Sequence, residues 1–265
     1  MLSMALPVPR PALLSLGISL ARGRVLVRIA WVMAALMALV GAAVAAYLGR
    51  EGRSAPLPSL LVLASAVYAY GAGFLVAFAG ATQAFRRDRD EGIRALVEAH
   101  GATRGEYLVA RAAGLAIVVA VAAVGATLLT GVIAMLSAAR LGLFVETGGA
   151  LLAALLATAL FSVVVTLVAL AALGGRTRMG GYFFLLLVFV APEGLSAWTS
   201  QLVPGGWGRL VSLPGILTAF QEALTPGTFD GALLARSSAA LVAALLVGGL
   251  AVRAELARIE AEGRP

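Results

Sequence analysis

The sequence predicts an all-α membrane protein with six transmembrane helices, and three observations support this fold class. Hydrophobic residues make up 61% of the 265 positions and charged residues only 12%, and the mean hydropathy is +0.99. Several apolar runs reach the roughly 20 residues that span a bilayer. The arginines gather in alternate connections between these runs, which is typical of a polytopic membrane protein.

Apolar stretches predict six spans, at about 29–48, 59–84, 107–136, 149–173, 181–198 and 233–252. An even number of spans places both termini on one side of the membrane. If that side is the cytoplasm, the inner segments hold 15 of the 20 arginines, so the positive-inside rule predicts a bacterial inner-membrane protein with both termini cytoplasmic. Basic charge of this kind indicates topology and contact with membrane lipids, and we expect no nucleic-acid partner.

Residues 1–28 form the first predicted domain, an N-terminal interfacial helix that lies along the membrane. Between Leu13 and Arg22 the polar side chains share one helical face and the leucines share another. A cleaved signal peptide carries its positive charges before the apolar stretch, but here the arginines follow it, so we expect the N-terminus to be retained. The transmembrane domain occupies residues 29–252, and residues 253–265 form a cytoplasmic tail.

A short amphipathic helix at about 88–100 lies between the second and third spans. It has an apolar face and a charged face, with Ile93, Leu96 and Val97 on the first and with i,i+4 pairs from Asp90 to Arg94 and from Arg94 to Glu98 on the second. This helix is either a handle that another protein pushes or a connector whose apolar side rests on lipid headgroups.

Two features predict how this helix ends and how the next one begins. Gly101 follows the last periodic residue, as a C-terminal stop does. Thr103 and Glu106 have the spacing of a capping box, so the next helix begins at Arg104 or Gly105. Counted from Arg104 to Ser137, that helix is longer than a bilayer requires and projects into the cytoplasm.

The outer segment 192–232 is rich in apolar residues but contains four prolines, which are too many for another span. We expect it to dip into the outer leaflet or to cover the outer end of the bundle. Its charges either keep the loop in water or contribute to an outer gate. The candidate gate residues are Glu193, Trp207, Arg209, Phe220 and Glu222.

Composition excludes several classes of function. The chain has no cysteine, one histidine and no lysine, so thiolate metal sites, multi-histidine sites and the lysine-containing phosphate loop of ATPases are absent from the sequence. We therefore expect no catalytic residue, no metal site and no bound cofactor in this chain. An intramembrane protease is also disfavoured, because its nucleophile or metal needs a partner that the spans lack.

In its layout the chain resembles the ABC-2 type transporter permeases. The most specific match is the acidic-glycine motif DEGIRAL at residues 90–96, followed by Thr103-Arg104 and by the basic Arg111 near the inner end of the third span. The sequence departs from the family pattern at Ala102, where proline is common, and at Ala110-Arg111, where Gly-Lys is common.

This resemblance implies a transport subunit, an exporter, that pairs with a second permease copy or homologous permease and with two separate ATPase subunits. The partner ATPases would bind ATP and Mg²⁺. The helix at 88–100 would be the coupling helix, with Ile93, Leu96 and Val97 as apolar contacts and Arg89, Arg94 and Glu98 as a polar rim. The coupling residues implied are Asp90, Glu91, Gly92, Ile93, Arg94, Leu96, Val97 and Glu98. The segment 192–232 would match the family's outward re-entrant helices.

Two alternatives stay open at the level of sequence. The six-span membrane component of the haem exporter in cytochrome c maturation has a similar acidic-glycine loop, and the turn at Arg178-Met-Gly180-Gly181 is similar to a turn of that protein. A membrane scaffold without transport activity would use the 88–100 helix to bind some other cytoplasmic protein.

Overall fold

The computed structural model describes residues 10–53, 56–139, 142–175, 178–203, 207–225 and 229–262. These residues are helical almost throughout and include no strand. The elements are α1 (Pro11–Arg22), α2 (Val25–Arg50), α3 (Leu57–Val67), η1 (Tyr68–Gly73), α4 (Phe74–Ala81), α5 (Ala84–Asp90), α6 (Ile93–Ala99), α7 (Arg104–Ala139), α8 (Phe144–Leu173), α9 (Arg178–Leu202), η2 (Trp207–Val211), α10 (Leu213–Leu224) and α11 (Gly231–Glu262).

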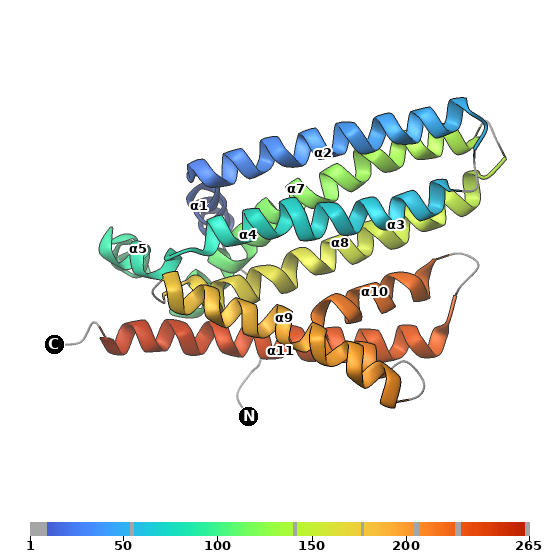
Figure 1. Ribbon diagram of the computed structural model, residues 1–265. Helices are drawn as coiled ribbons and strands as arrows, with labels where there is room; N and C mark the ends of the chain where they lie inside the picture. The colour runs from blue at the N-terminus through green and yellow to red at the C-terminus, as the bar shows by residue number, and fades with distance from the viewer. Residues whose placement is uncertain are drawn as a thin grey trace.

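The long helices lie side by side in one bundle (Figure 1). Among the described residues, five helical segments are long and apolar enough to cross a membrane: Val25–Arg50, Leu57–Asp90, Arg104–Ala139, Phe144–Leu173 and Gly231–Ala261. This agrees with an all-α, multi-pass membrane protein. The predicted span at 181–198 falls in α9, which is not among the five, so a sixth span stays a prediction.

Burial distinguishes the middle of the bundle from its edges. The most apolar window of α8 is 61% buried, whereas those of α11 and α2 are 28% and 22% buried. The core between α7 and α8 contains Leu115, Val119, Phe161 and Val165. The outward faces of α2 and α11 carry many exposed leucines and valines, as helices surrounded by lipid do.

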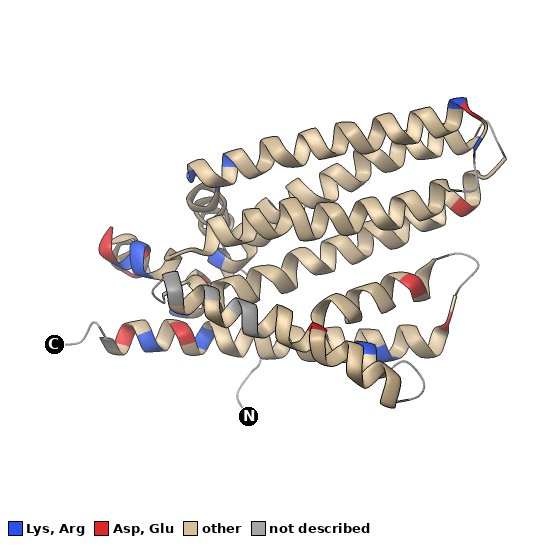
Figure 2. Cartoon of the chain, in the orientation of Figure 1, with Lys and Arg blue, Asp and Glu red and all other residues tan. Residues whose placement is uncertain are grey.

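Most charged residues gather at the two ends of the bundle and leave its middle largely apolar, as Figure 2 shows. One end holds α5, α6, the start of α7 and the last turns of α11; we call it the arginine-rich end. The other end, which we call the far end, holds the end of α2 at Arg50 and the start of α11 at Gly231. A largely uncharged middle between two charged ends is typical of a protein that spans a bilayer.

The helices divide three of the predicted segments differently. The helix predicted at 88–100 is two helices, α5 and α6, because Gly92 has a φ of 70° and breaks the helix between them. The predicted tail at 253–265 is helical as far as Glu262, since α11 continues through it. Pro192 does not begin an irregular segment, because α9 continues past it to Leu202.

After α9 the chain turns back through η2 and then forms α10, which packs against α8 and α11. The Ser212 hydroxyl accepts a hydrogen bond from the Gly215 amide at 3.0 Å and so caps the start of α10. In Figure 1, α10 lies between α8 and α11 and runs toward the far end. Whether this segment re-enters a membrane stays a prediction.

Helix α1 runs across the direction of the long helices, and Figure 1 shows it nearly end-on. It packs on α7 with almost no space between the two backbones. A Cβ atom added at Gly17 would lie 2.3 Å from the Ala110 carbonyl oxygen, and one added at Gly114 would lie 2.4 Å from the Gly17 carbonyl carbon. Glycine at both positions therefore permits this crossing. The N-terminal helix predicted in residues 1–28 is present at Pro11–Arg22, and residues 1–9 lie outside the described residues.

The second span contains a turn of π-helix, η1, between α3 and α4. The Tyr68 hydroxyl, at the start of this turn, forms a hydrogen bond of 2.7 Å with Thr130 Oγ1 on α7. A Cβ atom at Gly41 on α2 would lie 2.0 Å from the same hydroxyl oxygen. The π-turn was not predicted from the sequence, and its extra residue changes the helical register below it.

Candidate functional site

The candidate site is the pair of short helices α5 and α6 at the arginine-rich end. Its first attachment is to the end of α8. The amide of Gln83 donates to the Leu173 carbonyl at 2.7 Å, and the amide of Phe85 donates to the Gly174 carbonyl at 2.8 Å. The first amides of one helix and the last carbonyls of another are groups that their own helices leave unpaired. Joining them fixes α5 to the end of α8.

Arg24 fixes the chain just before α5, where α4 ends. It lies just before α2, and its Nη1 donates to the carbonyl oxygen of Ala79 at 2.8 Å and to that of Thr82. Burial and the nearby charges of Arg111 and Arg87 lower the pKa of Arg24 to about 10. The guanidinium therefore stays protonated at neutral pH and caps the last carbonyls of α4, where positive charge is favoured.

The second attachment is a buried ion pair between α5 and α7. Arg111 Nε lies 2.9 Å from Asp88 Oδ2, and the Tyr107 hydroxyl donates to the same oxygen at 2.7 Å. Asp88 and Arg111 are each only 2% exposed. Such a pair is costly to form but far more costly to break, because removing one partner leaves an uncompensated buried charge. It holds α5 rigidly against the start of α7.

The third attachment joins α6 to the last turns of α11. Glu260 pairs with Arg94 at 2.6 Å and with Arg104 at 2.9 Å, and Arg89 Nη1 donates to the Ile259 carbonyl at 3.3 Å. The side chains of Arg94 and Glu260 are only 16% and 14% exposed. Arg94, expected to lie in a rim facing a partner, is thus already bound within the chain.

The capping box and one of the two predicted side-chain pairs are confirmed. Glu106 accepts from the Thr103 amide at 2.7 Å, and its own amide donates to the Thr103 hydroxyl at 3.2 Å. Arg94 pairs with Glu98 at 3.1 Å. The predicted pair between Asp90 and Arg94 does not form, because the break at Gly92 separates their helices, and Asp90 pairs with Arg89 at 3.3 Å instead.

The predicted coupling residues divide into an exposed group and a buried group. Val97 is 5% exposed and belongs to the core, whereas Leu96 is 60% exposed; Ile93 packs partly against the core. Asp90, Glu91, Gly92 and Glu98 are exposed. Of the three apolar residues expected to contact a partner, Leu96 has the side chain most available for such a contact.

The candidate gate residues are brought together only in part. Arg209 and Glu222 form an ion pair of 3.2 Å between η2 and α10. Trp207 lies under the guanidinium of Arg236, whose central carbon is 5.2 Å from the centre of the Trp207 ring. Phe220 packs partly against the core. Glu193 is exposed on α9, and no hydrogen bond or ion pair joins it to the other four within the described residues.

The buried pair was not predicted, although a pattern for it exists in the sequence. Tyr107 and Arg111 are four residues apart, so they share one face of α7. Arg111 also falls inside the predicted third span, where a charge needs a partner. An acid near the end of the second span is the obvious candidate, and Asp88 is such an acid. The partnership of Glu260 with α6 had no comparable pattern.

No protein-family model matches this chain, and no curated protein matches it either. Among the described residues, no three histidine, aspartate or glutamate side chains come together as a metal site requires. What the site can do therefore follows from its geometry. The site is a rigid projection at the charged end of a helix bundle, joined to α7, α8 and α11.

Proposed function

We propose that this chain is the membrane permease subunit of an ATP-driven transporter of the ABC-2 type, an exporter, and that α5 and α6 couple it to a separate ATPase. A second permease, either another copy or a homologue, would complete the path. In this proposal the protein lies in a bacterial inner membrane, the arginine-rich end faces the cytoplasm, and η2 and α10 close the outer end.

The observation that supports the proposal best is the buried contact of Asp88 with Arg111 and Tyr107. A push on a loosely tethered loop would be absorbed by the loop. Here a push on α5 and α6 would reach α7, since the ion pair and the attachment to α8 leave little freedom between them. Helix α7 has 36 residues and runs the length of the bundle, at ~1.5 Å per residue. Its movement would carry force from one end to the other.

Leu96 supplies the contact that the proposal needs. It is a large apolar side chain, 60% exposed, on a helix whose other large apolar positions are wholly or partly buried. A single exposed apolar residue at the centre of a rigid projection is the kind of residue that fills a groove on a partner. The rim would consist of Glu91 and Glu98, which are also exposed.

The test is co-purification of the tagged chain from the membranes of its own host, followed by an ATPase assay of the purified complex. We expect an ATPase subunit to co-purify with the wild-type chain. We expect Leu96→Asn to reduce this binding by about 30-fold, since loss of a central apolar contact costs about 2 kcal/mol. A charge swap between Arg94 and Glu98 is a poorer variant, because it would also break the pair with Glu260.

The matched control is Val145→Asn, which removes an apolar side chain that is 83% exposed near the far end. It should leave ATPase binding unchanged. If the wild-type chain purifies without any nucleotide-binding partner, the transporter proposal fails and a scaffold function takes its place. Equal losses from Leu96→Asn and Val145→Asn would overturn the assignment of α6 as the coupling surface.

A further inference from the structure

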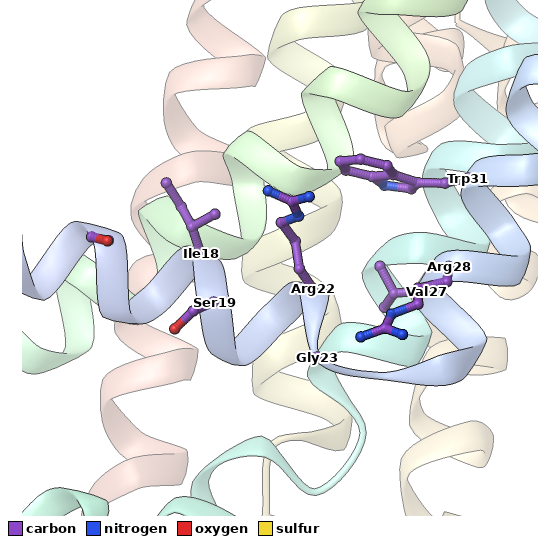
Figure 3. A pocket seen from close by; sticks show the side chains of 8 residues that line it. Ile18, Ser19, Arg22, Gly23, Val27, Arg28 and Trp31 are labelled. Carbon is purple, nitrogen blue, oxygen red and sulfur yellow. The ribbon is translucent and has the colours of Figure 1, made fainter.

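The elbow between α1 and α2 contains a hollow of about 540 Å³ that lies apart from α5 and α6. It is lined by Ser15, Ile18, Ser19, Arg22, Gly23, Val27, Arg28 and Trp31. This volume lies within the range of ligand sites, about 300–1,000 Å³. Figure 3 shows Arg22 and Trp31 facing each other across the elbow, with Arg28 reaching back toward the turn at Gly23.

The charge of the hollow is positive and unbalanced. Its lining contains two arginines and no acid, and neither Arg22 nor Arg28 forms an ion pair with any residue that the structure describes. The preceding segment, MLSMALPVP, contains no acidic residue and so cannot supply one. The third arginine of the elbow, Arg24, is turned inward onto α4. The two that remain are available to an anion from outside the chain.

Two further groups suit the hollow to a phosphate group. The guanidinium of Arg22 lies over the Trp31 ring, 5.4 Å from its centre, and such stacking holds an arginine in one orientation. The Trp31 Nε1 is buried and has no hydrogen-bond acceptor among the described residues. Arginine forks bind phosphate oxygens with two hydrogen bonds, so the two guanidinium groups suit such a ligand.

The surroundings of the hollow indicate where the phosphate comes from. Beyond the lining residue Arg28, the same helix α2 carries exposed apolar side chains: Ile29 is 54%, Val32 is 60% and Leu36 is 53% exposed. Acyl chains would lie along this surface while their headgroup occupies the elbow. Helix α1 runs across the bundle at this level, as an interfacial helix does. A free phosphate ion would make no use of the apolar surface.

We propose that this elbow is a binding site for the phosphate of an anionic phospholipid, with Arg22 and Arg28 gripping the headgroup and α2 supporting the acyl chains. The site stands apart from α5 and α6, and its occupancy does not depend on whether an ATPase binds there. Lipid held at this site would fix the angle between α1 and α2, and α1 in turn packs on α7.

The test is a titration of the purified full-length chain in neutral detergent with phosphatidylglycerol, followed by native mass spectrometry and thermal unfolding. The wild-type chain should retain one tightly bound phosphatidylglycerol and unfold at a higher temperature when it is bound. We expect Arg22→Gln with Arg28→Gln to weaken this binding by about 20- to 30-fold, at about fivefold for each arginine removed. Phosphatidylcholine should give no comparable retention.

The matched control is Arg50→Gln with Arg53→Gln, which removes the same charge from the far end of α2. It should leave lipid retention unchanged. Equal loss in both double variants would overturn the proposal, because it would show attraction to net charge alone. Inorganic phosphate that competes with the lipid at equal concentration would also overturn it, since the bound species would then be a free anion.

Discussion

At the scale of single residues, one carboxylate joins two helices at the arginine-rich end. Asp88 accepts hydrogen bonds from both Arg111 and Tyr107 in a site that water does not reach. The three carboxylates nearest to it in the sequence, Asp90, Glu91 and Glu98, are exposed. Of these four acidic residues, only the buried one, Asp88, joins α5 to α7.

We expect Asp88→Asn to destabilise the protein by about 3–5 kcal/mol, because it leaves the Arg111 charge buried without a counterion. Thermal unfolding in detergent, followed by circular dichroism, measures this loss. The control is Asp90→Asn, two residues away and exposed, which should cost about 0–1 kcal/mol. If both variants unfold at the same temperature, the buried pair does not have the role assigned to it.

At the same scale, one glycine of α7 is needed for packing and another is not. Gly114 touches the backbone of α1, and a Cβ atom there would lie 2.6 Å from the Ile18 nitrogen, whereas nothing lies within 4 Å of a Cβ atom at Gly125. We expect Gly114→Ala to destabilise the α1–α7 contact by about 1–3 kcal/mol and to increase hydrogen exchange throughout α1.

Gly125→Ala is the control for this substitution. Alanine is favoured over glycine in a helix interior by about 1 kcal/mol, so this variant should be neutral or slightly more stable. Rapid exchange in α1 after Gly125→Ala, or its absence after Gly114→Ala, would contradict the close crossing of the two helices.

At the scale of elements, an ion pair with the last turns of α11 helps to hold α6 in place. Glu260 forms ion pairs with both Arg94 and Arg104. We expect Glu260→Gln to loosen α6 and to raise hydrogen exchange over residues 93–99, while α8 stays protected. The loss should be about 1 kcal/mol or somewhat more, since the Glu260 side chain is largely shielded from water.

Glu51→Gln is the control. It tests whether the loss of any carboxylate would raise hydrogen exchange in α6. Glu51 is exposed at the end of α2, far from α6, so its substitution should leave exchange over residues 93–99 unchanged. An unchanged α6 after Glu260→Gln would show that the ion pairs do not hold it in place.

The elements themselves divide into those that local sequence predicts and those that it does not. The stop at Gly101 and the capping box of Thr103 with Glu106 depend on residues a few positions apart, and both were predicted correctly. The extent of α11 was not predicted, because the charges after residue 252 indicate where the apolar span ends and not where the helix ends. Arginine, glutamate, alanine and leucine are all good helix formers, and α11 continues until its side chains reach α6.

In the candidate site, too, local sequence predicts some features and not others. The position of the α5–α6 projection and the apolar face of α6 were predicted, because periodicity is a local property. Which side chains of that face are free was not predicted. Val97 is buried by contacts that depend on how α5, α6 and α7 come together, and no pattern within residues 88–100 distinguishes it from Leu96.

At the scale of the whole molecule, the arrangement of charge predicts how the protein is oriented in the membrane. The absence of cysteine makes this orientation easy to test. The chain contains no cysteine, so any cysteine introduced is the only one. Val145→Cys, near the far end, should react in intact cells with a thiol reagent that does not cross membranes. Ala95→Cys, on α6, should react only after the membrane is permeabilised, because the positive-inside rule predicts that the arginine-rich end faces the cytoplasm.

The opposite labelling pattern would invert the orientation and remove α6 from reach of a cytoplasmic ATPase. A cysteine-free chain provides the background for this measurement, since unmodified protein gives no label. The same variants can then be used in vesicles of known orientation, which separates slow labelling from true protection.

The crossing of α1 over α7 also has a consequence for the order of biosynthesis. Helix α1 leaves the ribosome before α7, and the surface on which it docks contains Gly114, which follows Gly17 by 97 residues. At about 5–20 residues per second this interval is about 5–20 s. During that time the newly made α1 lacks its main packing partner, and it takes its final place only once the third long helix has been made.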